Sequence, residues 1–142
     1  MNNPNFEDCL KEGKIKEFSR GKALVKKELE SAEFDFKAAK ESFKDKNYKW
    51  ATIQTYYSMF HSARALLYDK NYREKSHYCL IEAIRALYVE KGQVGYWLIE
   101  ALQKAKTLRE GADYYSEFSK EGAKDLIEKA KEFLNKTKEI LG

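Results

Sequence analysis

Arginine, aspartate and tyrosine side chains gather in one short segment near the end of an expected helix. The segment reads Arg109-Glu110-Gly111-Ala112-Asp113-Tyr114-Tyr115. The guanidinium of Arg109 can hold a phosphate in a bidentate contact, and Asp113 can orient that guanidinium. The ring of Tyr114 can stack on a base or donate a hydrogen bond. This pattern indicates an anion-binding site, and the alternative interpretation is an Arg109–Asp113 ion pair that only stabilises the fold.

A second group of candidate residues surrounds His77. This histidine lies near the start of an expected helix and beside a basic loop, so we expect it to be exposed. A histidine exchanges protons near neutral pH, and His77 joins Arg109 as a candidate catalytic residue, in the role of acid or base. The loop and its flanks alternate basic residues and tyrosines: Arg64, Lys70, Arg73, Lys75 and Arg85 with Tyr68, Tyr72 and Tyr78.

This alternation of cations and rings is typical of sites that bind single-stranded RNA or a nucleotide. We therefore assign Arg64 and Arg73 as candidate ligand-binding residues, in addition to Arg109, Asp113 and Tyr114. The alternative interpretation is a charged face that contacts only solvent.

Neither the histidines nor the cysteines indicate a metal site. Glu74-x-x-His77 fits half of a di-iron motif, but Ser58 precedes the only other histidine, His61, at that spacing. His61 lies in an apolar segment, so a satisfied core or interface histidine is the preferred interpretation. We expect no metal and no cofactor, because glycine-rich phosphate loops and dinucleotide fingerprints are also missing from the sequence.

Cys9 and Cys79 form no spaced motif, so the sequence indicates neither a disulfide framework nor a zinc site. Since Cys79 precedes Leu80 and Ile81, we expect it to be a buried, inert thiol.

Composition bounds the class of protein. A chain of 142 residues with 43% hydrophobic residues is expected to form one globular domain. A net charge of +4 permits contact with phosphate without demanding it. The longest uncharged run, residues 50–63, is too short to span a bilayer, and the N-terminus at residues 1–4 has no signal-peptide pattern. We expect a cytoplasmic protein without membrane contact.

Apolar residues at helical spacing predict the elements that must position these side chains. The first stripe predicts a helix over residues 22–46: Val25, Leu29, Ala32, Phe36, Ala39 and Phe43. The next helix, residues 48–68, is apolar on two faces, which implies burial against more than one partner and points to a homodimer.

Three further helices are expected downstream. Ser76 is a plausible N-cap of a helix that ends at Lys91-Gly92, a fourth helix runs from Val94 to near Gly111, and Ser119 caps a fifth. No useful strand pattern is found, and the residues before Phe18 are expected to form a short helix or stay loose. Short linkers favour antiparallel neighbours. The predicted fold is all-α, an up-and-down bundle of four to five antiparallel helices over residues 22–142, after a lead-in over residues 1–21.

From Leu24 to Leu141 the chain resembles the HEPN superfamily, named for higher-eukaryote and prokaryote nucleotide binding. The strongest match is Tyr56-Tyr57-Ser58-Met59-Phe60-His61-Ser62-Ala63-Arg64-Ala65-Leu66-Leu67. The turn Lys75-Ser76-His77, the pair Leu108-Arg109 with Ala112-Asp113-Tyr114, and the Lys/Glu-rich final helix also match. The resemblance implies a helical bundle, often homodimeric, whose members include ribonuclease toxins paired with a minimal nucleotidyltransferase.

The ribonucleases of this superfamily carry an Arg-x4–6-His motif, in which arginine holds the phosphate and histidine assists cleavage. If Arg109 is the motif arginine, tyrosine and serine stand where the histidine should be, at Tyr114, Tyr115 and Ser116. The sequence therefore leaves the enzyme question open. We expect a bundle that binds RNA or a nucleotide within a toxin–antitoxin-type module that includes a nucleotidyltransferase partner. The alternatives are an active metal-independent endoribonuclease toxin and a protein-interaction bundle without a nucleic-acid role.

Overall fold

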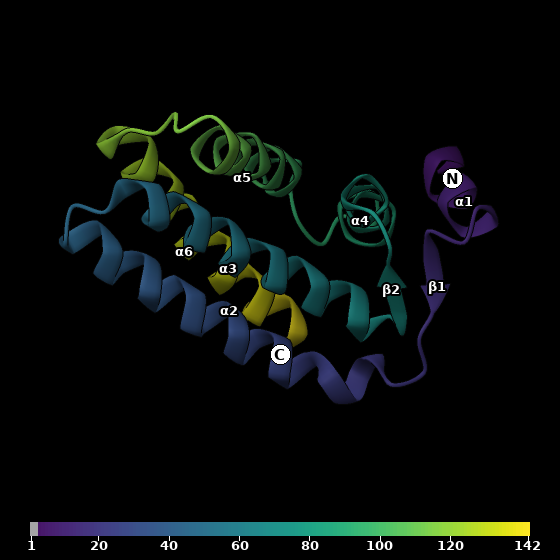
Figure 1. Ribbon diagram of the computed structural model, residues 1–142. Coiled ribbons are helices and arrows are strands. Elements are labelled where there is room, and N and C mark those ends of the chain that lie inside the picture. The colour runs from purple at the N-terminus through teal and green to yellow at the C-terminus, as the bar shows by residue number, and fades with distance from the viewer. Residues whose placement is uncertain (1–2) are drawn as a thin grey trace.

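Four long helices form where the apolar stripes predict them. In the computed structural model, which describes residues 3–142, α2 (Gly21–Lys44) and α3 (Tyr48–Asp69) run antiparallel around a short turn (Figure 1). They are followed by α5 (Trp97–Tyr114) and α6 (Lys120–Leu141). The predicted all-α bundle is confirmed, and within the described residues no helix is long and apolar enough to cross a membrane.

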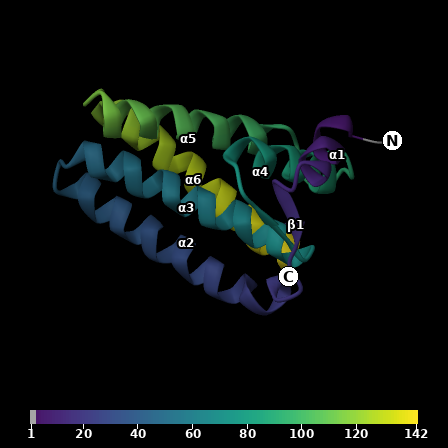
Figure 2. The ribbon, with the colours of Figure 1, turned by 45° about the vertical axis from the view of Figure 1, so that its right-hand side comes forward.

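Helix α3 is the central element, because it packs against α2, α5 and α6. Its two apolar faces explain this position, since Tyr56, Met59 and Leu66 are buried. Against α2 the contact is close: Ala32 is fully buried, and Ser58 Oγ donates a 2.7 Å hydrogen bond to its carbonyl oxygen. The rotated view in Figure 2 shows α5 lying over α3 and α6 on the side away from α2.

Side-chain caps set the starts of several helices. The predicted caps are confirmed: Ser76 Oγ accepts from the backbone N–H of Cys79 at 3.1 Å, and Ser119 Oγ accepts from that of Gly122 at 2.9 Å. These contacts satisfy backbone donors that have no partner inside the helix.

The helix that begins after Ser76 changes its geometry midway. It runs as α4 (His77–Ile84) and continues as the π-helix η1 (Arg85–Val89). Within η1 the buried Tyr88 donates a hydrogen bond to the carbonyl oxygen of Leu66 on α3, with a 2.5 Å separation. This hydrogen bond connects the C-terminal end of the segment that begins after Ser76 to the central helix α3.

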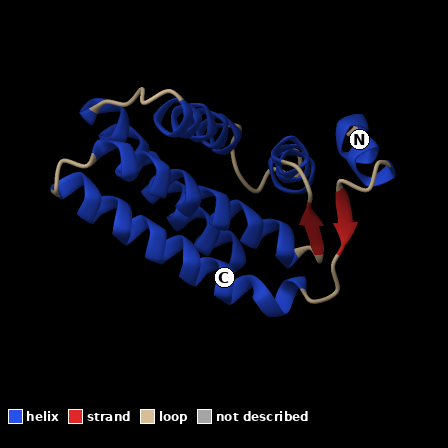
Figure 3. Cartoon of the chain, in the orientation of Figure 1, coloured by secondary structure: helices blue, strands red, loops and turns tan. Residues whose placement is uncertain are grey.

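The lead-in is ordered and contributes a strand, which the sequence did not indicate. Helix α1 (Pro4–Lys11) precedes β1 (Ile15–Glu17), which pairs antiparallel with β2 (Tyr72–Glu74) (Figure 3). Three residues per strand are too few to show a period in a sequence window. Residues 1 and 2 of the predicted lead-in lie outside the described residues, and the division at residue 21 stays a prediction.

Cys79 is buried, as expected, but the expectation of a free thiol is wrong, because Cys9 on α1 and Cys79 on α4 form a disulfide. Their Cα atoms are 5.8 Å apart although the residues are separated by 70 positions. Such a pair carries no spacing signature, and only the fold brings it together. The bond fastens the lead-in to the helix that begins with His77.

Candidate functional site

The last turns of α5 place Arg109 among aromatic rings of α3 and of α5 itself. Its guanidinium carbon lies 5.5 Å from the ring centre of Tyr56, 5.6 Å from that of Tyr57 and 5.4 Å from that of Tyr114. Nη2 donates to the hydroxyl of Tyr57 at 3.2 Å and lies 3.4 Å from Oδ2 of Asp113. The structure therefore brings together Arg109, Asp113 and Tyr114, and it does so because α5 continues to Tyr114, beyond the expected end near Gly111.

His77 joins this group through Tyr56. The hydroxyl of Tyr56 and Nδ1 of His77 are 3.2 Å apart, and the two rings are stacked with centres 6.0 Å apart. Tyr56 therefore touches His77 with its hydroxyl and Arg109 with its ring. We call Arg109, Tyr56, Tyr57, His77, Asp113 and Tyr114 the Arg109 cluster; it draws on α3, α4 and α5.

The expected exposure of His77 is wrong, because its side chain is largely covered. Burial lowers its pKa from 6.5 to about 4, and the positive charges of Lys106 and Arg109 act in the same direction. His77 is therefore neutral at pH 7. Its Nε2 is buried without a hydrogen-bond partner among residues 3–142, as is Nε of Arg109. Two buried polar atoms without a hydrogen-bond partner among residues 3–142 thus lie in one cluster.

Tyr56 stays protonated throughout the physiological range. Burial raises its pKa to about 12, which outweighs the opposite effect of the neighbouring Arg109. Its hydroxyl is thus available for one hydrogen bond with a neutral imidazole at His77, whichever ring nitrogen of the histidine carries the proton.

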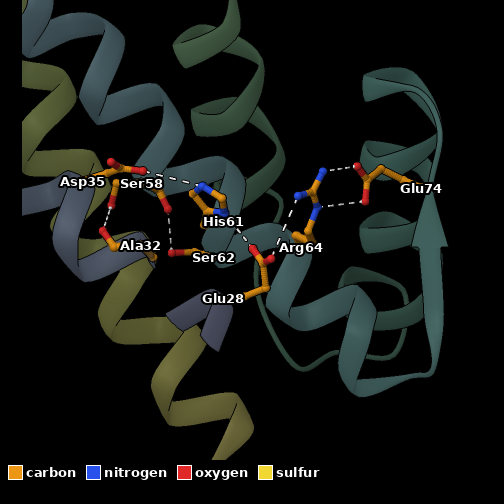
Figure 4. A network of polar contacts seen from close by, with 8 residues as sticks. All are labelled: Glu28, Ala32, Asp35, Ser58, His61, Ser62, Arg64 and Glu74. Carbon is orange, nitrogen blue, oxygen red and sulfur yellow. Dashed lines mark hydrogen bonds and ion pairs between the residues drawn. The ribbon is translucent and has the colours of Figure 1, made fainter. Parts of the chain in front are cut away.

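Arg64 has other partners. Its Nε and Nη2 donate to the two carboxylate oxygens of Glu74 at 3.2 and 2.8 Å, and Glu28 lies 4.0 Å away (Figure 4). Its guanidinium also lies 4.4 Å from the ring centre of Phe60. A bidentate ion pair of this kind fixes β2 against α3, so the contacts of Arg64 are structural ones.

Arg73 lies on β2, on the exposed face of the strand and away from the Arg64–Glu74 ion pair. Its guanidinium is 5.4 Å from the ring centre of Phe18. Its contacts leave this candidate ligand-binding residue accessible to solvent.

His61 connects α3 to α2, in agreement with the interpretation as a satisfied histidine. Its Nδ1 is 2.6 Å from the carboxylate of Glu28, and its Nε2 is 3.6 Å from that of Asp35 (Figure 4). Burial raises the pKa of Asp35, while His61 has the opposite effect. Within the described residues, no group of three or more His, Cys, Asp or Glu side chains is arranged to hold a metal ion.

Tyr56, Tyr57 and Lys106 belong to the site, although the sequence did not single them out for it. The two tyrosines open the segment that carries the resemblance, but nothing in their spacing relates them to α4 or α5. Lys106 precedes Arg109 by three positions, which places both cations on one face of α5.

Comparisons with known proteins place this chain among related sequences. The pattern of the HEPN domain family matches residues 25–140. Two curated proteins of Methanocaldococcus jannaschii, named "Putative toxin MJ0142" and "Putative toxin MJ0605", are each 33% identical to this chain. The first alignment spans 124 residues, 86% of this chain and 84% of the relative. The second spans 129 residues, 84% of this chain and 96% of the relative.

Proposed function

This chain belongs to the HEPN domain family, and from that premise we propose that it binds RNA through the Arg109 cluster. The observation that carries the proposal is the position of Tyr56 between Arg109 and His77. This position brings the guanidinium of Arg109, which could bind a phosphate, close to the neutral imidazole of His77 on another helix. Tyr57 and Tyr114 are 36% and 62% exposed, so their rings are accessible for stacking on bases.

The polar contacts of Arg109 leave room for a phosphate. Among residues 3–142 its single carboxylate partner is Asp113, which is 3.4 Å away and contributes one oxygen, less than a bidentate pair. The three tyrosine rings around Arg109 already restrict its side chain, so little side-chain entropy is lost when an anion binds. Lys106 adds a second positive charge near His77.

A binding measurement tests this proposal. Fluorescence anisotropy with a labelled single-stranded RNA of about 20 nucleotides, at about 50 mM salt with EDTA, should show binding by the unaltered protein. Arg109→Ala should weaken the affinity by roughly tenfold, and Arg109→Lys should recover part of it because the charge remains. Lys124→Ala, on the exposed side of α6, is the control and should change nothing.

Absence of RNA binding at low salt would overturn the proposal and favour a bundle that contacts only proteins. Equal affinities for Arg109→Ala and Lys124→Ala would show that the RNA binds elsewhere. Circular dichroism of each variant separates a lost contact from a lost fold.

Metal-independent RNA cleavage is the second candidate function, and the Tyr56–His77 contact favours it. In that reaction His77 takes the proton of a 2′-hydroxyl, and the oxygen attacks phosphorus. The bond from phosphorus to the 5′-oxygen breaks, the leaving oxygen takes up a proton, and a 2′,3′-cyclic phosphate remains. A base with a pKa of about 4 is weak at neutral pH, but a bound phosphate offsets the repulsion from Lys106 and Arg109.

Cleavage of mixed RNAs in EDTA distinguishes this candidate from binding alone. We expect fragments with cyclic phosphate ends, reduced by His77→Gln and abolished by Arg109→Ala. Intact RNA under conditions where anisotropy shows full binding would contradict cleavage and leave the binding proposal in place.

We also propose that the protein works as a homodimer in a toxin–antitoxin-type module with a nucleotidyltransferase partner. The relatives named as toxins support the module, and membership of a family whose proteins are often homodimers supports the dimer. Light scattering should give twice the 16.7 kDa mass of the chain. A monomer at micromolar concentration would contradict the dimer, and co-purification with the product of a neighbouring gene tests the partner.

A further inference from the structure

The two-stranded ribbon carries four basic side chains on its outer face. Lys16 on β1 is paired with Arg73 on β2, and the backbone N–H of Lys75 donates to the carbonyl of Lys14 at 2.8 Å. Lys14 and Lys75 lie one residue outside β1 and β2, and continuing the alternation of the strands puts their side chains on the same side as those of Lys16 and Arg73. All four are exposed.

The inner face of the ribbon explains why the basic side chains point outward. Ile15 is 1% exposed, and its partner Glu74 forms the bidentate ion pair with Arg64. A shift of register by one residue would expose Ile15 and bury cations, so the orientation is strongly determined. Figures 1 and 3 show the ribbon at one end of the bundle, beside α1 and the start of α4.

Like charges on facing strands repel each other. Across residues 3–142, none of the four basic side chains has a carboxylate oxygen within 4.0 Å. The proximity of Lys16 is the main reason that the pKa of Lys75 is lowered, and Arg73 adds to the effect. Unrelieved repulsion of this kind opposes folding, and a bound anion would remove it.

The spacing of the cations suits a chain of phosphates. Residues two apart on a strand are about 7 Å apart, and paired strands are about 5 Å apart. The four side chains therefore leave the backbone within a small rectangle. Their total charge equals the net charge of +4 carried by the whole chain.

We propose that the outer face of the β1–β2 ribbon binds the phosphate backbone of a single-stranded RNA and leads the strand to the Arg109 cluster. The direction follows from the chain, since Lys75 precedes His77 by two residues. Tyr78, which directly follows His77 in the chain, is 58% exposed and offers a ring for base stacking. Exposed rings at the end of a basic track favour RNA over an acidic protein. This inference rests on the proposed function of the cluster.

The test replaces the cations and follows the salt dependence of RNA binding. The ribbon variant carries Lys16→Gln, Arg73→Gln and Lys75→Gln. With the labelled RNA described above, its affinity should fall at least about tenfold at 50 mM salt. The slope of log Kd against log salt should shrink by about 2, since each phosphate contact to a single strand contributes about 0.7.

A matched control variant removes the same charge from exposed lysines on α2 and α6: Lys37→Gln, Lys124→Gln and Lys131→Gln. It should keep both the affinity and the slope, apart from a small effect of net charge. The ribbon variant should melt close to the unaltered protein, because the relief of repulsion offsets the lost contact of Arg73 with the Phe18 ring. A lower melting temperature would show that the cations are structural and would overturn the proposal.

The outcomes separate this inference from the proposal for the cluster. If the ribbon variant and the control bind RNA equally while Arg109→Ala binds weakly, the ribbon track is wrong and the cluster stands. If the ribbon variant loses binding and Arg109→Ala does not, the track stands and the cluster is wrong. If the unaltered protein binds heparin but no RNA, the assignment of RNA as the ligand is overturned.

Discussion

At the scale of single residues, burial gives Tyr56 and His77 a fixed charge state at neutral pH. Tyr56 keeps its proton and His77 lacks one, so the hydrogen bond between them joins two neutral groups. The nearby positive charge belongs to Lys106 and Arg109. A phosphate that binds here therefore contacts the permanently charged Arg109. Its negative charge then raises the pKa of the neighbouring His77.

Acid should destabilise the protein through His77. Its folded-state pKa of about 4 lies below the unfolded value of 6.5, so above pH 6.5 neither state binds the proton and stability is unaffected. Between pH 6.5 and 4 the unfolded state takes up the proton first, and the stability of the fold declines. The melting temperature should fall more steeply from pH 7 to 5 for the unaltered protein than for His77→Gln. Parallel slopes would contradict the lowered pKa, because His61 and the carboxylates are common to both proteins.

At the scale of elements, the start of α2 can lie against the end of α3 because residue 21 is a glycine and has no side chain. A Cβ atom added to Gly21 would meet the carbonyl oxygen of Tyr68 and approach the Cα of Asn71 to 3.1 Å. Both neighbours are backbone at the end of α3, so neither can move cheaply. The close approach also lets the side chain of Asn71 accept a hydrogen bond from the backbone N–H of Lys22 at 3.1 Å.

Gly21→Ala should therefore destabilise the protein by about 1–3 kcal/mol, the usual cost of overpacking. Gly111→Ala is the matched control, because Gly111 lies inside α5. An added Cβ atom there would come no closer than 3.4 Å to the carbonyl oxygen of Glu117 and 3.8 Å to the Cβ atom of Glu117. Alanine is the better helix former, so this change should stabilise by up to about 1 kcal/mol. Urea denaturation measures both, and equal effects would contradict the described contact between α2 and α3.

At the scale of the whole molecule, the disulfide joins the two ends of a long stretch of chain. With 70 positions between Cys9 and Cys79, the loss of unfolded-state entropy gives an upper estimate of roughly 4 kcal/mol of stabilisation. Cys9→Ala with Cys79→Ala should lower the urea midpoint accordingly, and a reductant should bring the unaltered protein close to the variant. A midpoint that does not respond to reductant would show that the bond is not formed in solution.

The sequence predicted the long helices because their apolar residues recur over several turns, as Val25, Leu29 and Ala32 do on α2. It predicted Arg109, Asp113 and Tyr114 as one group because they are close in the chain, but it ended the helix near Gly111, whereas α5 continues to Tyr114. It did not reveal the contact of Tyr56 with His77, the ribbon or the disulfide. Each of these joins segments far apart in the chain, and their residues carry no local pattern that specifies the partner.

The bond between Cys9 and Cys79 also makes the intervening chain a covalent ring that contains both strands and the whole of α2 and α3. One protease cut inside the ring, for example in the exposed turn at residues 45–47, would leave the two halves connected through sulfur. A nicked molecule should run as a single band without reductant and as two fragments with it. In an oxidising medium, this protein would therefore stay in one covalent piece after a first cut that would separate a linear chain.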